Sequence, residues 1–306
     1  MPRNRYIAFA EDAMKLATIL LNHKEEACIQ TRPGVLPISV VNSVFKKKWS
    51  TDILELLVSG QFYTLKAWYD KGGRTQIESL AEHSLPIEDV RFGPLYRHPR
   101  KIWGIGLNYI KHASDLSEKS PTSAPASFSK FDTTVIGPGD TIVIPIQSNK
   151  TTGEAELAVI FGKECKNVPE KDWLSVVAGF TCVLDMTAED ILRENPRYLT
   201  RSKNFDTFFS FGPFLATPDE IDDICSLKVA TVLNSEIQAD NIVSNMTFPP
   251  DYLVSFHTHV ATMLPGDIIS TGTPRAVPLK QGDLLECRID NFEPLINPVV
   301  DLKVKK

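Results

Sequence analysis

The 306-residue sequence lacks the paired cysteines, the excess of basic residues and the long apolar runs that mark several classes of protein. Its five cysteines stand far apart and form no Cys-x-x-Cys pair, which argues against zinc or dithiol redox chemistry and favours a reducing compartment. A formal net charge of −5 provides no basic field for nucleic acid. No stretch approaches the ~20 apolar residues of a membrane-spanning helix.

The beginning of the chain also lacks the pattern of a signal peptide. The apolar stretch after Met14 is interrupted at Asn22 and His23, and Glu11 and Asp12 precede it. The sequence contains no internal repeat at a fixed period and no low-complexity tract, which argues against solenoids and propellers. We therefore expect a cytoplasmic enzyme or binding protein without a nucleic-acid or membrane partner.

The sequence pattern divides the chain into two regions. Short apolar runs from Met14 to about Val41, separated by turn residues, predict small antiparallel strands, and Thr51 is placed to cap a short helix that ends before Gly60. Prolines between residues 86 and 99 predict an extended connector. We expect a small N-terminal α+β domain over residues 1–98 and a second domain over residues 99–306.

The second domain is dominated by apolar runs of strand length. Short helical stretches fall between some of them, over 109–118, 187–194 and 251–263. The pattern predicts a mixed, strand-dominated α+β fold and not a doubly wound sheet. The expected strands are 102–107, 141–145, 155–161, 177–184, 228–233, 267–270, 284–289 and 298–304.

Two acids on one of these runs are candidate metal ligands. Glu154 and Glu156 stand two apart in EAELAVIFGK, so a strand places both side chains on the same face. On a solvent-facing strand the pair would be ordinary. The apolar residues around it indicate a buried strand, where carboxylates stay charged only if they are paired or bind a cation.

A third acid, Asp185, ends the apolar run 177–184, just before the helix expected at Thr187. An aspartate in that place is commonly a helix cap, but the ends of buried strands are also where site residues gather. Three carboxylates completed by water would form an all-oxygen site that suits Mg²⁺ or Mn²⁺ and can also accept Ca²⁺.

Six stretches in order resemble the fumarylacetoacetate hydrolase family. They are IGLNYIKHASD at 105–115, VIGPGD at 135–140, EAELAVIFGK, AGFTCVLDMTAED at 178–190, LTRSKNFDTFFSFGP at 199–213 and LPGDIISTGTP at 264–274. The resemblance covers residue 100 to the C-terminus. It implies a C-terminal β-sandwich roll, commonly a homodimer, with the active site at one end of the roll.

The resemblance also implies roles for individual residues. The family's metal ligands fall on Glu154, Glu156 and Asp185, and the lysine of its K-x-F-D stretch falls on Lys203. The histidine after G-L-N-Y falls on His112, beside Asp115. The residues that line the substrate carboxylate in the T-G-T-P turn fall on Gly272 and Thr273.

The chain departs from the family pattern where specificity is set. Asp115 stands where acylpyruvate hydrolases carry glutamate, Glu189 reverses the charge of a frequent arginine, Leu192 replaces a glutamine and Ala276 replaces a glycine. The scaffold and the metal ligands are therefore better specified by the sequence than the substrate is.

The implied chemistry is carbon–carbon bond cleavage in a 2-oxo acid or β-diketone, of the acylpyruvate or fumarylacetoacetate type. A metal and Lys203 would stabilise an enolate, and His112, oriented by Asp115, would activate water. Oxaloacetate decarboxylation, keto–enol tautomerisation, hydration and isomerisation could use the same parts. A non-catalytic binding protein on the same fold is a further alternative, against which the intact acidic triad argues.

Overall fold

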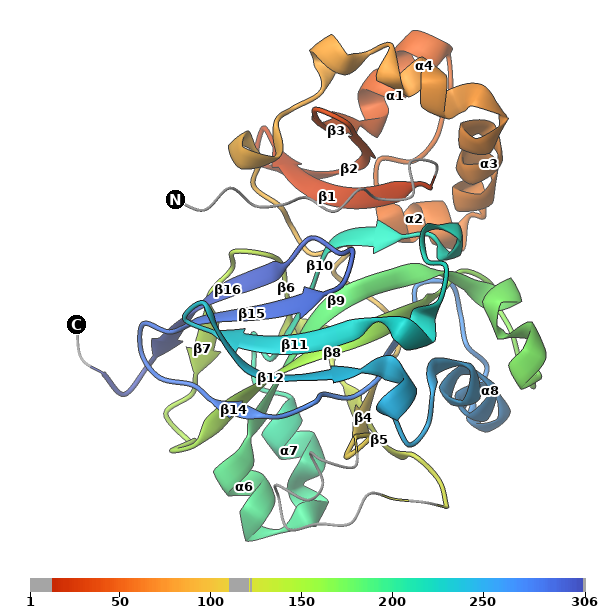
Figure 1. The fold of residues 1–306 in the computed structure, drawn as a ribbon. Coiled ribbons are helices and arrows are strands. Elements are labelled where there is room, and N and C mark those ends of the chain that lie inside the picture. Colours follow the sequence, from red (N-terminus) through yellow and green to blue (C-terminus); the bar gives the residue numbers. More distant parts are fainter. Residues whose placement is uncertain (1–12, 110–120, 122, 305–306) are drawn as a thin grey trace.

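The protein, seen here in a computed structural model that describes residues 13–109, 121 and 123–304, is built on two β-sheets (Figure 1). The larger sheet has 11 strands with the main order β3-β2-β1-β10-β9-β8-β13-β4-β5, while β14 pairs with β8 and β6 with β10. The smaller sheet has five strands in the order β12-β11-β15-β16-β7. This arrangement confirms the mixed, strand-dominated α+β fold.

The elements of the first 98 residues are three strands followed by helices: β1 (Lys15–Leu21), β2 (Lys24–Thr31), β3 (Gly34–Pro37), α1 (Ile38–Phe45), α2 (Ile53–Val58), α3 (Gln61–Trp68) and α4 (Arg74–Glu78). The turn between β1 and β2 places Asn22 and His23 at φ 51° and 63°, the left-handed region that a two-residue hairpin turn requires. These strands confirm the predicted antiparallel set.

Two details of that prediction are wrong. The chain turns helical directly after Pro37, whereas strand structure was expected as far as Val41. The helix after residue 51 is capped by Asp52, whose side chain accepts a hydrogen bond from the backbone N–H of Glu55, and not by Thr51. An aspartate one residue closer to the helix satisfies the orphan N–H group directly.

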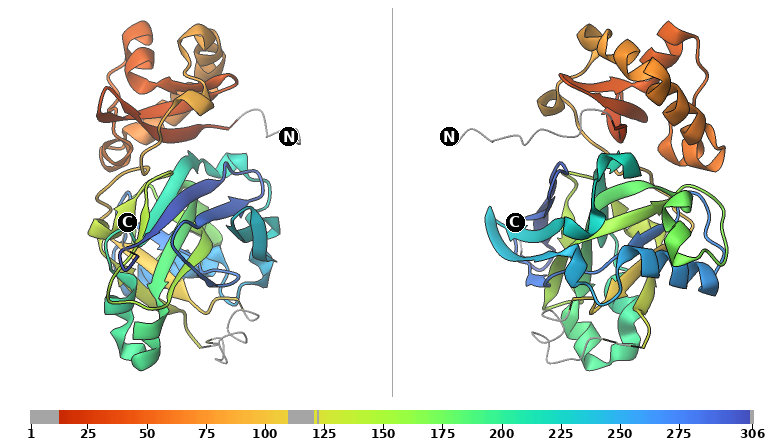
Figure 2. Two further views of the ribbon diagram at one scale, coloured as in Figure 1. Left: turned by 90° about the vertical axis from the view of Figure 1, so that its left-hand side faces the viewer. Right: turned by 45° about the vertical axis from the view of Figure 1, so that its right-hand side comes forward.

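The N-terminal strands continue the large sheet, because β1 pairs antiparallel with β10 (Phe209–Ala216). Figures 1 and 2 show this region stacked at one end of the second part of the chain. One hydrophobic cluster includes residues of both parts, among them Leu16, Leu56, Ile160 and Phe211. The division at residue 98 stays a prediction.

The remaining strands of the large sheet are β4 (Ile102–Gly106), β5 (Ala126–Lys130), β6 (Val135–Ile136), β8 (Thr151–Phe161), β9 (Val177–Ala188), β13 (Ile268–Ser270) and β14 (Val277–Pro278). Those of the smaller sheet are β7 (Ile142–Ile144), β11 (Lys228–Leu233), β12 (Glu236–Ile242), β15 (Leu284–Ile289) and β16 (Leu295–Asp301). The sequence predicted eight of the strands after residue 98, missed β5, β6, β10, β12 and β14, and placed the start of β16 three residues late.

The two longest strands, β8 and β9, form the centre of the large sheet and are buried along their whole length. Alternate residues of both strands pack against the smaller sheet in a second hydrophobic cluster that includes Leu157, Leu184 and Leu285. The helices α6 (Glu189–Glu194) and α7 (Leu199–Lys203) lie at the end of the sheet opposite the N-terminal region, and α8 (Pro250–Val260) lies at its side (Figure 1). Among the described residues no helix is long and apolar enough to cross a membrane.

Candidate metal centre

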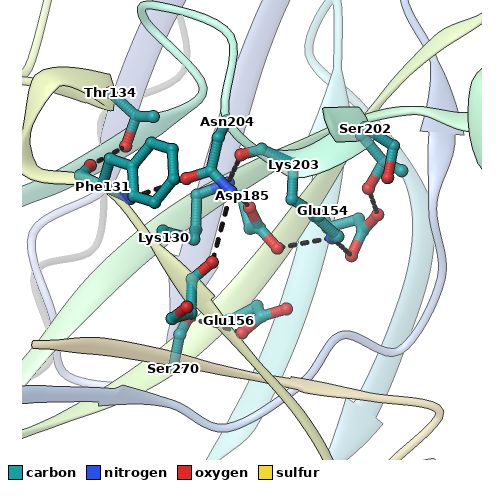
Figure 3. A network of polar contacts seen from close by, with 12 residues as sticks. Lys130, Phe131, Thr134, Glu154, Glu156, Asp185, Ser202, Lys203, Asn204 and Ser270 are labelled. Carbon is teal, nitrogen blue, oxygen red and sulfur yellow. Dashed lines mark hydrogen bonds and ion pairs between the residues drawn. The ribbon is translucent and has the colours of Figure 1, made fainter. Parts of the chain in front are cut away.

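Three acids converge at the start of β8. Glu154 is paired across the strands with Asp185 of β9, and Glu156 follows on the same face two residues later. Their ligand oxygen atoms all lie within 4.8 Å of one another (Figure 3). Asp185 is a residue of the strand itself, which runs on to Ala188, so the prediction that the strand ends before it was wrong.

Each of the two glutamates has a hydrogen-bond donor that fixes its carboxylate. The Thr187 hydroxyl donates to Oε1 of Glu154 over 2.6 Å. The Ser270 hydroxyl and the backbone N–H of Gly272 donate to Oε2 of Glu156 over 2.5 and 2.9 Å. Among the described contacts these donors leave Oε1 of Glu156 available for a cation, whereas Oε2 of Glu154 accepts from Nζ of Lys203.

Gly272 is the glycine that the sequence assigned to the substrate side, and its φ of +100° is one that residues with a Cβ rarely adopt. A Cβ there would lie 2.8 Å from the Cβ of Asn108. The neighbouring Thr273 is 3% exposed and donates from its hydroxyl to the carbonyl oxygen of Arg275. Among the described contacts, Gly272 therefore binds the triad directly, and the side-chain contacts of Thr273 are with Arg275.

Two buried lysines neutralise most of the acidic charge (Figure 3). Nζ of Lys203, at the end of α7, lies 2.5 Å from Asp185 Oδ2 and 3.1 Å from Glu154 Oε2. Nζ of Lys130, at the end of β5, donates to Asp185 Oδ1 and to the carbonyl oxygen of Lys203, each over 2.5 Å. When all five groups are ionised, the three carboxylates and two ammonium groups leave one negative charge in excess.

Sequence reasoning missed Lys130. It stands in ASFSK, a short polar and apolar mixture that was not assigned to any strand. Its position relative to Asp185 depends on the pairing of β5 with β4 and of β4 with β13. No local sequence pattern therefore predicts that Lys130 contacts Asp185. The alternation in β5 was the one local signal of a half-buried strand.

The electrostatics of the site follow from burial and like charge. Burial, followed by the charges of Asp185 and Glu154, raises the pKa of Glu156 to about 8. Burial alone would lower the pKa of the Lys203 ammonium, but the three nearby carboxylates outweigh it and raise the pKa above its usual value. The pKa of Lys130 is lowered, chiefly by complete burial. Lys203 is thus held as a cation, while Glu156 needs a further positive partner to remain charged.

The predicted residues His112 and Asp115 lie outside the described residues. The segment that leads to them is fixed by Asn108, whose Nδ2 donates to the carbonyl oxygens of Thr271 and Phe248 over 2.7 and 3.0 Å. Its Oδ1 accepts a hydrogen bond from the N–H of Phe248. The G-L-N-Y stretch therefore runs beside the turn that contains Gly272.

The donor set fits a hard divalent cation. Carboxylate oxygens are the ligands that Mg²⁺ and Mn²⁺ prefer, and three of them can occupy half of an octahedron. Glu156, which no lysine of the described chain contacts in an ion pair, is the acid with most to gain from a bound cation. Glu154, Glu156 and Asp185 would hold the ion.

Residues 101–300 match the family model described as fumarylacetoacetate (FAA) hydrolase C-terminal. The chain belongs to the fumarylacetoacetate hydrolase family. The matched range contains every residue of the centre described above. It begins at the connector after the N-terminal strands and helices.

Proteins from several organisms are similar to the chain. A protein of Archaeoglobus fulgidus described as uncharacterized is 39% identical over 72% of this chain and 86% of its own. The mitochondrial oxaloacetate tautomerase Fahd2a of Rattus norvegicus is 35% identical over 71% of each chain. A solved structure of maleylpyruvate hydrolase from Sphingobium sp. SYK-6, in complex with manganese(II) ion and pyruvate, is 25% identical over 94% of this chain and 99% of that one, with a TM-score of 0.74.

Proposed function

We propose that this protein is a divalent-metal-dependent enzyme that acts on a short 2-oxo acid through its enolate, with keto–enol tautomerisation of oxaloacetate as its reaction. The observation that carries the proposal is the convergence of Glu154, Glu156 and Asp185 with the buried ammonium group of Lys203. The similarity to oxaloacetate tautomerases over 71% of the chain supports the choice of reaction.

The three acids would hold Mg²⁺ or Mn²⁺, which when bound polarises a carbonyl oxygen and neutralises charge that develops on it. Lys203 adds a second, fixed positive charge at the same place, since the three nearby carboxylates raise its pKa and keep it protonated. In tautomerisation a proton leaves the carbon next to the carbonyl group and a proton is added to the carbonyl oxygen. The fixed charges of the site lower the energy of the enolate between the two transfers.

A second candidate is cleavage of the carbon–carbon bond of an acylpyruvate-type substrate. The similarity to maleylpyruvate hydrolase favours it. This reaction needs a base that takes a proton from water, and His112, oriented by Asp115, is the sequence candidate for that role. Decarboxylation of oxaloacetate, the other alternative, would need enolate stabilisation but no water-activating base.

The test is a metal-dependent assay of the purified protein with oxaloacetate and with acylpyruvates. Enol content, carbon–carbon cleavage and loss of carbon dioxide are followed separately. We expect the metal-free protein to be inactive and Mg²⁺ or Mn²⁺ to restore interconversion of the keto and enol forms. Full activity without metal would overturn the proposal.

The His112→Ala variant separates the two candidates. For a hydrolase it should lower cleavage by roughly 10²–10⁴-fold, because general base catalysis contributes that much. We also propose a homodimer, which the family resemblance implies, and a cytoplasmic location, which the scattered cysteines favour; the name of the rat relative places that protein in mitochondria. Light scattering and cell fractionation test these two points.

A further inference from the structure

The strand β5 contacts Lys203 at two places. Its residues Phe128 and Lys130 stand two apart, so both side chains lie on one face of the strand. The Nζ atom of Lys203 lies 4.8 Å from the centroid of the Phe128 ring, and Lys130 binds the carbonyl oxygen of the same lysine. We propose that Phe128, with its ring seated on Gly104, is a positioning residue that holds the Lys203 ammonium group against the acidic triad.

Gly104 provides the space that the ring occupies. It is paired with Phe128 across the β4–β5 ladder. A Cβ at residue 104 would lie 2.2 Å from Cζ and 2.4 Å from Cε2 of the ring, closer than a real contact allows. The ring therefore lies directly on the backbone of β4, and its place is fixed by the absence of a side chain at this position.

An aromatic ring suits this role for a chemical reason. A lysine side chain is a flexible four-carbon stem that needs restraint to keep its charge in one place. The face of an aromatic ring attracts an ammonium group without occupying one of its hydrogen-bond donors. Lys203 uses its donors on Asp185 and Glu154, so the ring adds restraint on a side where no carboxylate contacts it.

Only the expected effect on turnover rests on the proposed function; the expected effect on the position of Lys203 does not. The alternative is that Phe128, which is 8% exposed, fills space in the same way as any buried aromatic residue. Phe214, which is 3% exposed and packs against Phe92, is the matched control, because its replacement by leucine also removes a buried ring. Among the described residues Phe214 contacts neither the acids nor Lys203.

In the metal-loaded enzyme, Phe128→Leu should lower kcat about 3- to 30-fold, the range that corresponds to a partly or fully desolvated cation–π contact. KM and metal affinity should stay within about threefold, because the acids are untouched. Phe214→Leu should lose similar thermal stability and keep its kcat. Equal kcat losses in the two variants would overturn the proposal.

Gly104→Ala tests the seat of the ring. The added methyl group must displace the ring, so this variant should lower kcat as Phe128→Leu does. In the Phe128→Leu background the ring is gone, and Gly104→Ala should then change kcat less than twofold. Additive losses in the double variant would contradict the stacked arrangement.

A readout independent of activity is the rate at which an amine-acylating reagent modifies each lysine in the metal-free protein, followed by peptide mass spectrometry. Without the ring, Lys203 should react at least fivefold faster relative to Lys130, which serves as the internal reference for general opening of the site. Equal acceleration of both lysines, or none, would overturn the proposal. If Lys203 alone accelerates but no oxo acid is converted, the positioning role stands and the proposed function fails.

Discussion

The two faces of the β8–β9 pair bury different kinds of side chain. On one face Glu154, Glu156 and Asp185 stand within reach of one ion. On the other face Leu157 and Leu184 pack against the smaller sheet. Both faces are buried, and consecutive residues of the same strands supply both.

The comparison shows how a sheet can hold unfavourable charge in a defined place. The apolar face contributes burial energy and fixes the register, and a slip of one residue would send the acids into the hydrophobic core. In the metal-free protein the acidic face contributes no such stabilisation, because Glu156 must either take up a proton or be buried as an anion without a cationic partner. Stability and chemistry are therefore divided between alternate residues. Substitutions of the acids should lower metal affinity without lowering stability, and substitutions on the apolar face should lower stability without lowering metal affinity.

The largest expected effect is on the acidic face. Glu156→Gln should lower metal affinity by more than about 100-fold and abolish turnover, since changes in outer-shell groups alone cost 10–100-fold. The same change should raise the melting temperature of the metal-free protein, because it removes a buried carboxyl group whose raised pKa makes folding at neutral pH take up a proton, while Ser270 and Gly272 can still donate to the amide oxygen. Calorimetric titration with Mn²⁺ and thermal unfolding with chelator measure the two effects.

The control for this prediction is Glu286→Gln. Glu286 lies in the smaller sheet, is 3% exposed and binds Arg288, so the change also removes a buried carboxylate. It should leave metal affinity unchanged and should lower stability. If Glu156→Gln destabilises the metal-free protein as the control does, burial of the Glu156 carboxyl group is not what limits stability on this face.

The next effect concerns charge compensation. Lys130→Met should destabilise the metal-free protein by roughly 3–5 kcal/mol, the cost of breaking a buried ion pair by removal of one partner. A bound cation compensates part of the lost charge, so the melting temperature should rise more on metal addition than it does in the wild type. Denaturant unfolding with chelator and with Mg²⁺ checks both points.

For comparison, Lys228→Met removes a half-exposed pair with Asp240 and should cost less than about 1 kcal/mol, with no dependence on metal. An equally small loss in Lys130→Met would mean that Lys203 alone compensates Asp185.

On the apolar face, Leu157→Ala should cost about 2–5 kcal/mol of unfolding free energy, since the side chain is fully buried and its removal leaves a cavity. Metal affinity per folded molecule should stay within about threefold. Urea unfolding combined with a metal titration at low temperature measures the pair of values. A large loss of metal affinity in folded protein would show that the two faces are not independent.

The sequence predicted the acidic face well and its surroundings poorly. Glu154 and Glu156 are close in the chain, so strand alternation alone places them together, and Asp185 follows from the resemblance and the neighbouring apolar run. Phe128 and Lys130 reach the same centre through the pairing of β5 with β4 and of β4 with β13, which no local pattern encodes. The continuation of the N-terminal strands through β1 and β10 was missed for the same reason.

The smallest expected effect concerns the Tyr63 hydroxyl, an uncharged polar group buried beside Gly162, just past the end of β8. The Tyr63 hydroxyl has no hydrogen-bond partner in the described structure, and a Cβ at Gly162 would lie 2.2 Å from it. Tyr63→Phe should therefore be neutral or stabilise the protein by about 1 kcal/mol at neutral pH. Nζ of Lys163 lies 5.1 Å from the ring centroid, a contact that phenylalanine keeps.

The stability difference between Tyr63→Phe and the wild type should grow as the solution becomes more alkaline. Burial, with a smaller contribution from Cys165, raises the pKa of Tyr63 to about 12 from 10.0. A raised pKa means that the unfolded chain loses this proton first, so the stability that the group contributes is complete below pH 10 and is lost as the pH rises to about 12. The unfolding free energy of the wild type should fall more steeply than that of Tyr63→Phe over this window, because phenylalanine has no proton to lose. Urea unfolding at intervals between pH 8 and pH 12 yields the difference curve, and two parallel curves would show that Tyr63 ionises equally easily in both states.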